Sequence, residues 1–209
     1  MRSALTQALL VCAAHARFGD RQGLRKHIPG PLCSCGNWGR WHDAGANTPL
    51  CCIEQTVNVL QEIAMQLNAH NVTYTLSCGS LLGAVRCGQM IPWDYDGDIE
   101  AYGTPKAFSA AINAWRKAHA GPRVTGVFGN IGNVHIGDVH IDIGNSGLPA
   151  PATAPCKLGK HNFMCRRDYD RSLTAMYGAD WRTPRRWCNW QKLHLCSSVR
   201  RSDANMLCA

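Results

Sequence analysis

The sequence has no uninterrupted apolar run of 18 residues, no long lysine and arginine run with interleaved aromatic residues, and no internal repeat. The first absence predicts no integral membrane span, since a transmembrane helix needs about 20 apolar residues. The second argues against a nucleic-acid partner, although the formal net charge is +8. That charge is better suited to steering a small anionic substrate such as a nucleotide-linked donor. Charged residues make up only 17% of the chain and hydrophobic ones 45%, which excludes a disordered protein.

The chain is long enough, at 209 residues, to bury a core as one domain, yet it carries 12 cysteines. This cysteine count is high for a cytosolic protein, and it indicates disulfides in an oxidising compartment, a structural metal, or both. Residues 1–16 resemble a short signal peptide that ends in Ala14-His15-Ala16, and the alternative is a first helix of the folded domain. We therefore expect the secretory pathway, either the Golgi lumen or the secreted state. Asn71-Val72-Thr73 is an N-glycosylation sequon, a triplet that also arises by chance.

Apolar periodicity predicts an α+β domain with a small mixed β-sheet flanked by helices. Helical spacing covers residues 49–68, 80–86, 105–120 and 168–177. Strand patterns cover residues 72–78, an aspartate-bearing stretch that ends near Tyr102, 123–128 and 134–143. The flanking segments 17–50 (irregular and cysteine-rich) and 188–209 (a basic, cysteine-containing tail) show no period, and Gly147 to Pro155 is expected to be a loop.

Two adjacent motifs concentrate the polar chemistry of the chain. The first is C-G-S-L-L-G-A-V-R at residues 78–86, and the second is I-P-W-D-Y-D-G-D-I at residues 91–99. Asp94, Asp96 and Asp98 alternate and therefore share one face of an extended chain, where like charges repel unless a cation or solvent compensates them. The alternatives to a catalytic divalent-metal site are a solvated acidic turn and a calcium loop. The glutamate that would close an EF-hand ligand set is absent.

These motifs resemble the signature of the LicD/fukutin-related family. V-H-I-D-I at residues 139–143 and Y-G-A-D-W at residues 177–181 are similar to later family segments. The resemblance implies a nucleotidyltransferase-like fold, with a catalytic domain over residues 50–187. It also implies transfer of phosphocholine or ribitol (alditol) phosphate from a CDP-linked alcohol donor to a hydroxyl of a glycan or glycoprotein acceptor.

The resemblance places the ligands of Mg²⁺ (or Mn²⁺) at Asp96, Asp98 and Asp142. Asp94 lies on the same strand face and would be a further ligand or a support, and either Asp94 or Asp142 could accept a proton from the attacking hydroxyl. An ordinary ion pair with His140 is the alternative for Asp142. His140 itself could orient Asp142 or simply fill the face of the sheet.

Gly79, Ser80 and Arg86 are the candidate substrate-binding residues. Gly79 and Ser80 would cradle the donor phosphates with backbone N–H groups and the serine hydroxyl, while Ser80 as a helix N-cap is the structural alternative. Arg86 would pair with phosphate oxygens through its guanidinium fork, and the alternative is a surface arginine.

Cys33, Cys35, Cys51 and Cys52 form a second candidate site. Four thiolates can hold a structural Zn²⁺, and the resemblance implies such a site before the same helix, although Cys33 and Cys35 are closer together than expected. Disulfides are the alternative. Two rival functions also stay open at this point: a non-catalytic secreted module that binds glycan or metal, and a nucleotidyltransferase that transfers NMP. Gly97, where the family usually has an aliphatic residue, leaves room for the non-catalytic module.

Overall fold

The computed structural model describes residues 48, 50–92, 94, 96–119 and 139–183, together with the backbone alone of 127–128, 131–136, 185–186 and 197–198. The predictions made for residues 1–47, Cys33 and Cys35 included, lie outside these residues, and so does most of the tail after residue 187.

Four helices occur among the described residues. They are α3 (Leu50–Ala69), α4 (Cys78–Cys87), α5 (Pro105–Ala118) and α6 (Tyr169–Tyr177). At the start of α5, the Thr104 hydroxyl accepts from the backbone N–H of Ala107 and Pro105 fills the first helical turn, as the Thr-Pro pair predicts. None of the helices in this part of the chain is long and apolar enough to cross a lipid bilayer.

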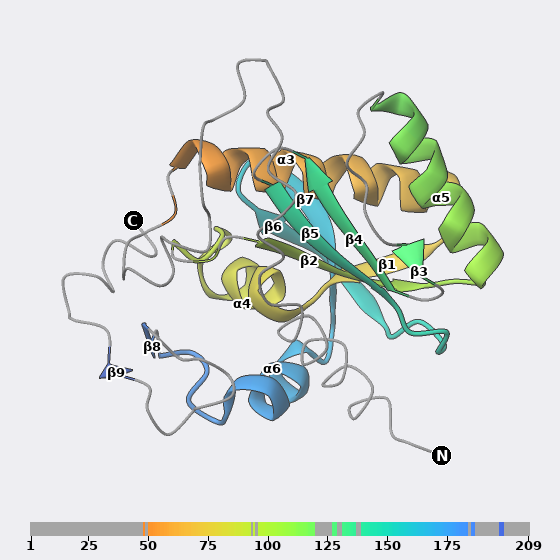
Figure 1. Ribbon diagram of the computed structural model, residues 1–209. Helices are drawn as coiled ribbons and strands as arrows, with labels where there is room; N and C mark the ends of the chain where they lie inside the picture. Colours follow the sequence, from red (N-terminus) through yellow and green to blue (C-terminus); the bar gives the residue numbers. More distant parts are fainter. Residues whose placement is uncertain are drawn as a thin grey trace.

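A five-stranded mixed sheet forms the centre of the molecule, in the order β1-β2-β5-β4-β3 (Figure 1). Its strands are β1 (Thr73–Leu76), β2 (Asp96–Tyr102), β3 (Val127–Phe128), β4 (Ile131–Ile136) and β5 (Val139–Asn145). Only β2 and β5 run parallel among the described strand pairs of this sheet; the other pairs are antiparallel. Together with the helices, this sheet confirms the α+β class.

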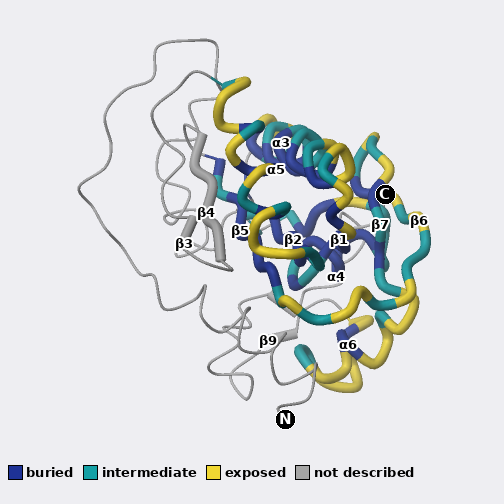
Figure 2. Tube along the Cα trace, turned by 90° about the vertical axis from the view of Figure 1, so that its right-hand side faces the viewer, coloured by how far each residue is buried: buried dark blue, intermediate teal, exposed yellow. Residues whose placement is uncertain are grey.

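The two faces of the sheet have different neighbours. Ile99, Ile141 and Ile143 point to one face and are fully buried, and the same face meets Leu60 of α3 at Gly97. α5 packs against α3 with Phe108, Ile112 and Trp115 buried. α4 lies on the opposite face, with α6 beyond it (Figure 2). The acidic residues at even positions of β2 therefore point toward α4, away from the apolar core.

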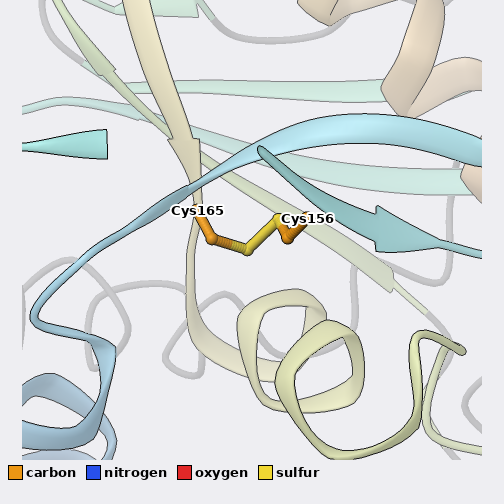
Figure 3. Close-up of a disulfide and its surroundings, with 2 residues drawn as sticks. All are labelled: Cys156 and Cys165. Atoms are coloured by element: carbon orange, nitrogen blue, oxygen red, sulfur yellow. A yellow bond between two sulfur atoms is a disulfide. The ribbon is translucent and has the colours of Figure 1, made fainter. Parts of the chain in front are cut away.

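A two-stranded hairpin, β6 (Thr153–Leu158) and β7 (His161–Arg166), packs against α4 and β1. A disulfide between Cys156 and Cys165 ties its two strands together (Figure 3). Leu158 and Phe163 are buried and join the hairpin to the core. A second small pair joins β8 (Arg185–Arg186) to β9 (Ser197–Ser198).

Three local predictions need correction. The single strand expected over 134–143 is two antiparallel strands, β4 and β5. The loop expected from Gly147 to Pro155 ends early, since β6 begins at Thr153. The short helix expected over 80–86 begins at Cys78, so Ser77 and not Ser80 is its N-cap residue.

Candidate active site

Three carboxylates meet at the start of β2. Asp94 precedes the strand, and Asp96 and Asp98 lie on one face of it. One ligand atom from each of the three lies within 4.8 Å of the others, so a single ion could contact all of them. Asp98 is buried at 7% exposure, and at such a position an uncompensated charge is costly.

The first turn of α4 holds these carboxylates in place. Ser80 and Asp98 pair reciprocally: the Ser80 N–H donates to Asp98 Oδ2 at 3.1 Å, and the Asp98 N–H donates to Ser80 Oγ at 3.0 Å. A Cβ atom added at Gly79 would lie 2.2 Å from Asp94 Oδ2 and 3.4 Å from Asp98 Oδ2. Glycine is therefore required at this position for the helix backbone to approach the carboxylates this closely.

These contacts give Gly79 and Ser80 a role that differs from the one expected. Ser80 is completely buried, and both its N–H and its hydroxyl are engaged by Asp98. Binding of donor phosphates by Gly79 and Ser80 stays a prediction. What the geometry shows is that the two residues position the acidic groups.

Asp142 lies next to the cluster on the neighbouring strand. In the parallel register, Asp98 is opposite Asp142 and Asp96 is opposite His140. Asp142 Oδ1 lies 2.8 Å from His140 Nε2, and the Asp142 side chain is only 3% exposed. His140 therefore orients Asp142. The three carboxylates that lie close together are those of Asp94, Asp96 and Asp98, whereas the sequence analysis placed Asp142 with Asp96 and Asp98.

Burial, followed by repulsion between like charges, dominates the electrostatics of the site. Burial raises the pKa of Asp98 well above its usual range, and the charges of Asp96 and Asp142 add to this, while N–H groups of Ser80 and Gly79 oppose it. Burial and then Asp142 also raise the pKa of Asp96. Burial disfavours the His140 cation, but the bond to Asp142 outweighs it and raises the pKa of His140. A site that penalises its own anions in this way favours a bound cation.

The donor set fits a hard divalent metal. All candidate ligand atoms are carboxylate oxygens, which suit Mg²⁺ and Mn²⁺ and not the softer metals that select sulfur or imidazole. A divalent cation among these carboxylates would offset both the cost of burying their charges and their mutual repulsion.

Arg86, at the C-terminal end of α4, contacts protein carbonyls. Its Nη2 atom donates to the carbonyl of Trp181 and, at 3.3 Å, to that of Thr183. Burial lowers the pKa of Arg86 to about 10, and the neighbouring Tyr177 partly offsets this effect. Direct binding of phosphate by Arg86 stays a prediction, because the structure shows only its contacts to the segment after α6.

Sequence reasoning missed two polar residues near the site. Tyr177 ends α6 in the field of Asp94, Asp96 and Asp98; burial, followed by these three charges, raises the pKa of Tyr177 well above 10. Glu100 follows Asp98 on the same face of β2, and burial raises its pKa to about 7. The even spacing from Asp96 to Glu100 was a signal for the second residue.

Cys51 and Cys52, at the start of α3, both take part in disulfide bonds in the structure. A disulfide sulfur offers no thiolate to a metal, so this state corresponds to the disulfide alternative for the pair. Cys33 and Cys35 lie outside the described residues. The four-cysteine Zn²⁺ site stays a prediction, to be tested by metal analysis of the purified protein together with mapping of its disulfides.

Comparison with known proteins identifies the segment that builds the site. Residues 71–132 match the family model described as LicD/FKTN/FKRP, nucleotidyltransferase domain. A stretch of 64 residues is 44% identical to the mouse (Mus musculus) protein named "Ribitol 5-phosphate transferase FKRP". A stretch of 55 residues is 46% identical to the human (Homo sapiens) protein of the same name. Residues 71–132 are therefore similar to the nucleotidyltransferase domain of the LicD/fukutin-related family.

These matches cover only a part of this chain and a small part of each relative. They include 31% and 26% of this chain, but only 12% of the mouse protein and 11% of the human one. The segment matched by the family model contains Gly79, Ser80, Arg86 and the three clustered aspartates, whereas Asp142 and Tyr177 lie beyond it. The match to the LicD/fukutin-related family therefore includes the three clustered aspartates and the residues of α4. The structure places Asp142 beside them.

Proposed function

We propose that this protein is a metal-dependent phosphotransferase of the LicD/fukutin-related family. It moves a phosphorylated alcohol, phosphocholine or an alditol phosphate such as ribitol phosphate, from a CDP-linked donor to a hydroxyl of a glycan or glycoprotein, and CMP is released. The observation that carries the proposal is the cluster of Asp94, Asp96 and Asp98, because it lies inside the segment that matches the family. The name of the mouse and human relatives supports ribitol phosphate as the first group to test.

The aspartates of β2 and β5 carry the proposed chemistry. Asp96 and Asp98, with Asp142 and Asp94 beside them, would hold Mg²⁺ or Mn²⁺. Bound there, the metal supplies charge neutralisation of the donor phosphates and a lower pKa of the attacking hydroxyl. Ser80 and Gly79 hold Asp98 and Asp94 in position, and His140 orients Asp142.

The reaction is an in-line displacement without a covalent enzyme intermediate. The acceptor oxygen forms a bond to the phosphorus that carries the alcohol, and the bond from that phosphorus to the CMP oxygen breaks. The hydroxyl proton passes to a carboxylate, Asp142 or Asp94, and CMP leaves with the bonding electron pair. The site contributes mainly by positioning and by charge stabilisation.

We place this activity in the secretory pathway, in the Golgi lumen or after secretion. The disulfides at Cys51, Cys52 and Cys156–Cys165 support an oxidising compartment.

The test is a product screen with CDP-ribitol, CDP-choline and CDP-glycerol, each with Mg²⁺ or Mn²⁺ and a panel of glycan acceptors. We expect CMP release with one donor and an acceptor mass increased by the phosphorylated alcohol. An acceptor that gains CMP would instead establish the NMP-transferring alternative. A protein that binds glycan but neither binds CDP in a metal-dependent way nor releases CMP would be the non-catalytic module.

A further inference from the structure

The C-terminal end of α4 is fastened to the segment that follows α6. Arg86 donates to the carbonyls of Trp181 and Thr183. Trp181 is 3% exposed and meets Tyr169 edge to face, with 6.4 Å between the ring centroids. The guanidinium of Arg182 lies 4.2 Å above the Trp181 ring. The Arg86 hydrogen bonds hold the backbone of residues 181–183 against α4, and the ring contacts hold Trp181 in place beside α6.

The other end of α4 meets the carboxylates, through Ser80 with Asp98 and through Gly79 close to Asp94. One helix of ten residues therefore joins the acidic cluster to the anchored segment. Because α4 is a single rigid element, the position of that segment relative to the aspartates is set by the Arg86 contacts.

Tyr177 lies just before the anchored segment in the chain. It is the last residue of α6, four residues before Trp181, and its ring packs against the core. α6 packs against α4, the helix that carries Arg86 and meets the carboxylates. After burial, the charges of Asp98, Asp94 and Asp96 raise the pKa of the Tyr177 phenol, and the charge of Arg86 lowers it. A tyrosine hydroxyl donates one hydrogen bond at neutral pH, so it can serve a phosphate that a metal brings to these carboxylates.

We propose that Arg86 and Tyr177 form a positioning pair. Arg86 anchors the segment after α6 and thereby holds the Tyr177 hydroxyl where it donates a hydrogen bond to a phosphate oxygen of the nucleotide. The pair rests on the proposed function, since a CDP-linked donor is the ligand that the function requires. It differs from the sequence-based prediction, in which Arg86 contacts the phosphate itself.

The test is calorimetric binding of Mn²⁺ alone, and then of CDP in the presence of Mn²⁺, to the full chain. Tyr177→Phe is expected to weaken CDP binding about tenfold and to leave Mn²⁺ affinity unchanged, as for loss of one hydrogen bond to a charged group. Tyr169→Phe, at the other end of the same helix, is the matched control: it keeps the ring that meets Trp181 and loses only the hydroxyl, so it is expected to bind both as wild type does.

Arg86 is tested by coupling. Arg86→Ala is expected to weaken CDP binding by a similar factor. Arg86→Lys is expected to recover only part of it, because the shorter, flexible lysine lacks the planar guanidinium that holds Nη2 at both carbonyls. The double variant Arg86→Ala/Tyr177→Phe is expected to be no weaker than either single variant, since both act through one contact. The near-UV circular dichroism spectrum and the midpoint of thermal unfolding of each variant separate loss of binding from loss of fold.

The possible results are distinct. Wild-type CDP affinity in Tyr177→Phe, or losses that add in the double variant, would overturn the pair, and additive losses would restore Arg86 as a direct phosphate ligand. Weaker Mn²⁺ binding in Tyr177→Phe would also overturn it, because the hydroxyl would then act on the carboxylates. A wild-type protein that shows no Mn²⁺-dependent CDP binding would overturn the proposed function itself.

A separate observation concerns the sequon at residues 71–73. Asn71 is exposed in the turn between α3 and β1, at a left-handed φ of 56°, and the Thr73 side chain is exposed beside it. Thr73 is opposite Tyr102, at the far end of β2 from Asp96. These ends are six residue steps apart along β2, about 20 Å at the usual rise per residue. Asn71 would therefore be accessible to the enzyme that attaches N-glycans, and a glycan at Asn71 would lie far from the carboxylates.

We infer that Asn71 is an N-glycosylation site, given the secretory location proposed above. The test is the electrophoretic mobility of the chain secreted from mammalian cells, before and after treatment with peptide N-glycosidase. One shifted band is expected for wild type and for Thr73→Ser, and none for Thr73→Ala or Asn71→Gln. Asn68→Gln, which changes an asparagine outside any sequon, is the matched control. A secreted wild-type protein without a shift, or a shift that persists in Asn71→Gln, would overturn the assignment.

Discussion

Replacing Asp98 with asparagine isolates the metal-binding role of the acidic cluster. Asparagine keeps the shape of the side chain and an oxygen that can accept from the Ser80 N–H, so the fold should survive. In metal-free protein, Asp98→Asn removes one of several like charges that raise the pKa values of the group, so its free energy of unfolding should equal or exceed that of wild type.

The expected size of the effect follows from ligand linkage. A metal present at 100 times its Kd stabilises the folded state by about 2.7 kcal/mol, which for a chain of this size raises Tm by roughly 5–10 °C. Wild type should show this rise when Mn²⁺ is added after dialysis against a chelator. Asp98→Asn should show little or none.

A control variant guards against a non-specific effect of metal on acidic protein. Asp170 is an aspartate on α6 with a side chain 61% exposed, paired with Arg182 outside the cluster. Asp170→Asn should therefore keep the full metal-dependent rise in Tm. A full rise in Asp98→Asn, or no rise in wild type, would refute the assignment of Asp98 as a metal ligand.

Three further substitutions test other parts of the account. Gly97→Ala should lower the free energy of unfolding by about 1–3 kcal/mol in urea denaturation, because the new Cβ would lie 2.7 Å from the buried Leu60 side chain; an unchanged midpoint would contradict this packing. Gly79→Ala should fold but bind Mn²⁺ more weakly in calorimetry, because its Cβ displaces Asp94, whereas unchanged affinity would argue that Asp94 is no ligand. In buffer that contains a chelator, Glu100→Gln should have a larger free energy of unfolding than wild type at pH 8 but not at pH 4. The pKa of Glu100 rises from 4.5 to about 7 on folding, so wild type loses stability as pH rises through this window, by at most about 3 kcal/mol, and a pH-independent difference would contradict this.

The sequence predicted the acidic face well because strand periodicity is short and strict. Asp94, Asp96 and Asp98 alternate, and alternation alone places them on one side of an extended chain. The pairing of Asp98 with Asp142 needed the parallel register of β2 and β5, which no local pattern specifies.

The hairpin of β6 and β7 was missed for a physical reason. Pro155 lies within β6, and proline and alanine in this stretch are typical of a loop. What stabilises the pair is tertiary: the buried Leu158 and Phe163 and the disulfide between Cys156 and Cys165. The division of 134–143 into two strands was better signalled, since Gly137-Asp138 is a dipeptide typical of a tight hairpin turn.

The roles of the residues around the carboxylates were also beyond the sequence. Ser80 and Arg86 fit a phosphate site by residue type, but their observed contacts are to Asp98 and to the carbonyls of Trp181 and Thr183. These partners lie 18, 95 and 97 residues away along the chain, so only the folded arrangement reveals them.

The most direct test of the central claim is a crystal structure of the protein with Mn²⁺ and CDP, with the metal located by its anomalous scattering. The account predicts a metal peak at the oxygens of Asp96 and Asp98, at about 2–2.2 Å, with the CDP phosphates bound to the same ion. A Mn²⁺ ion located elsewhere, or CDP bound away from the three aspartates, would contradict it.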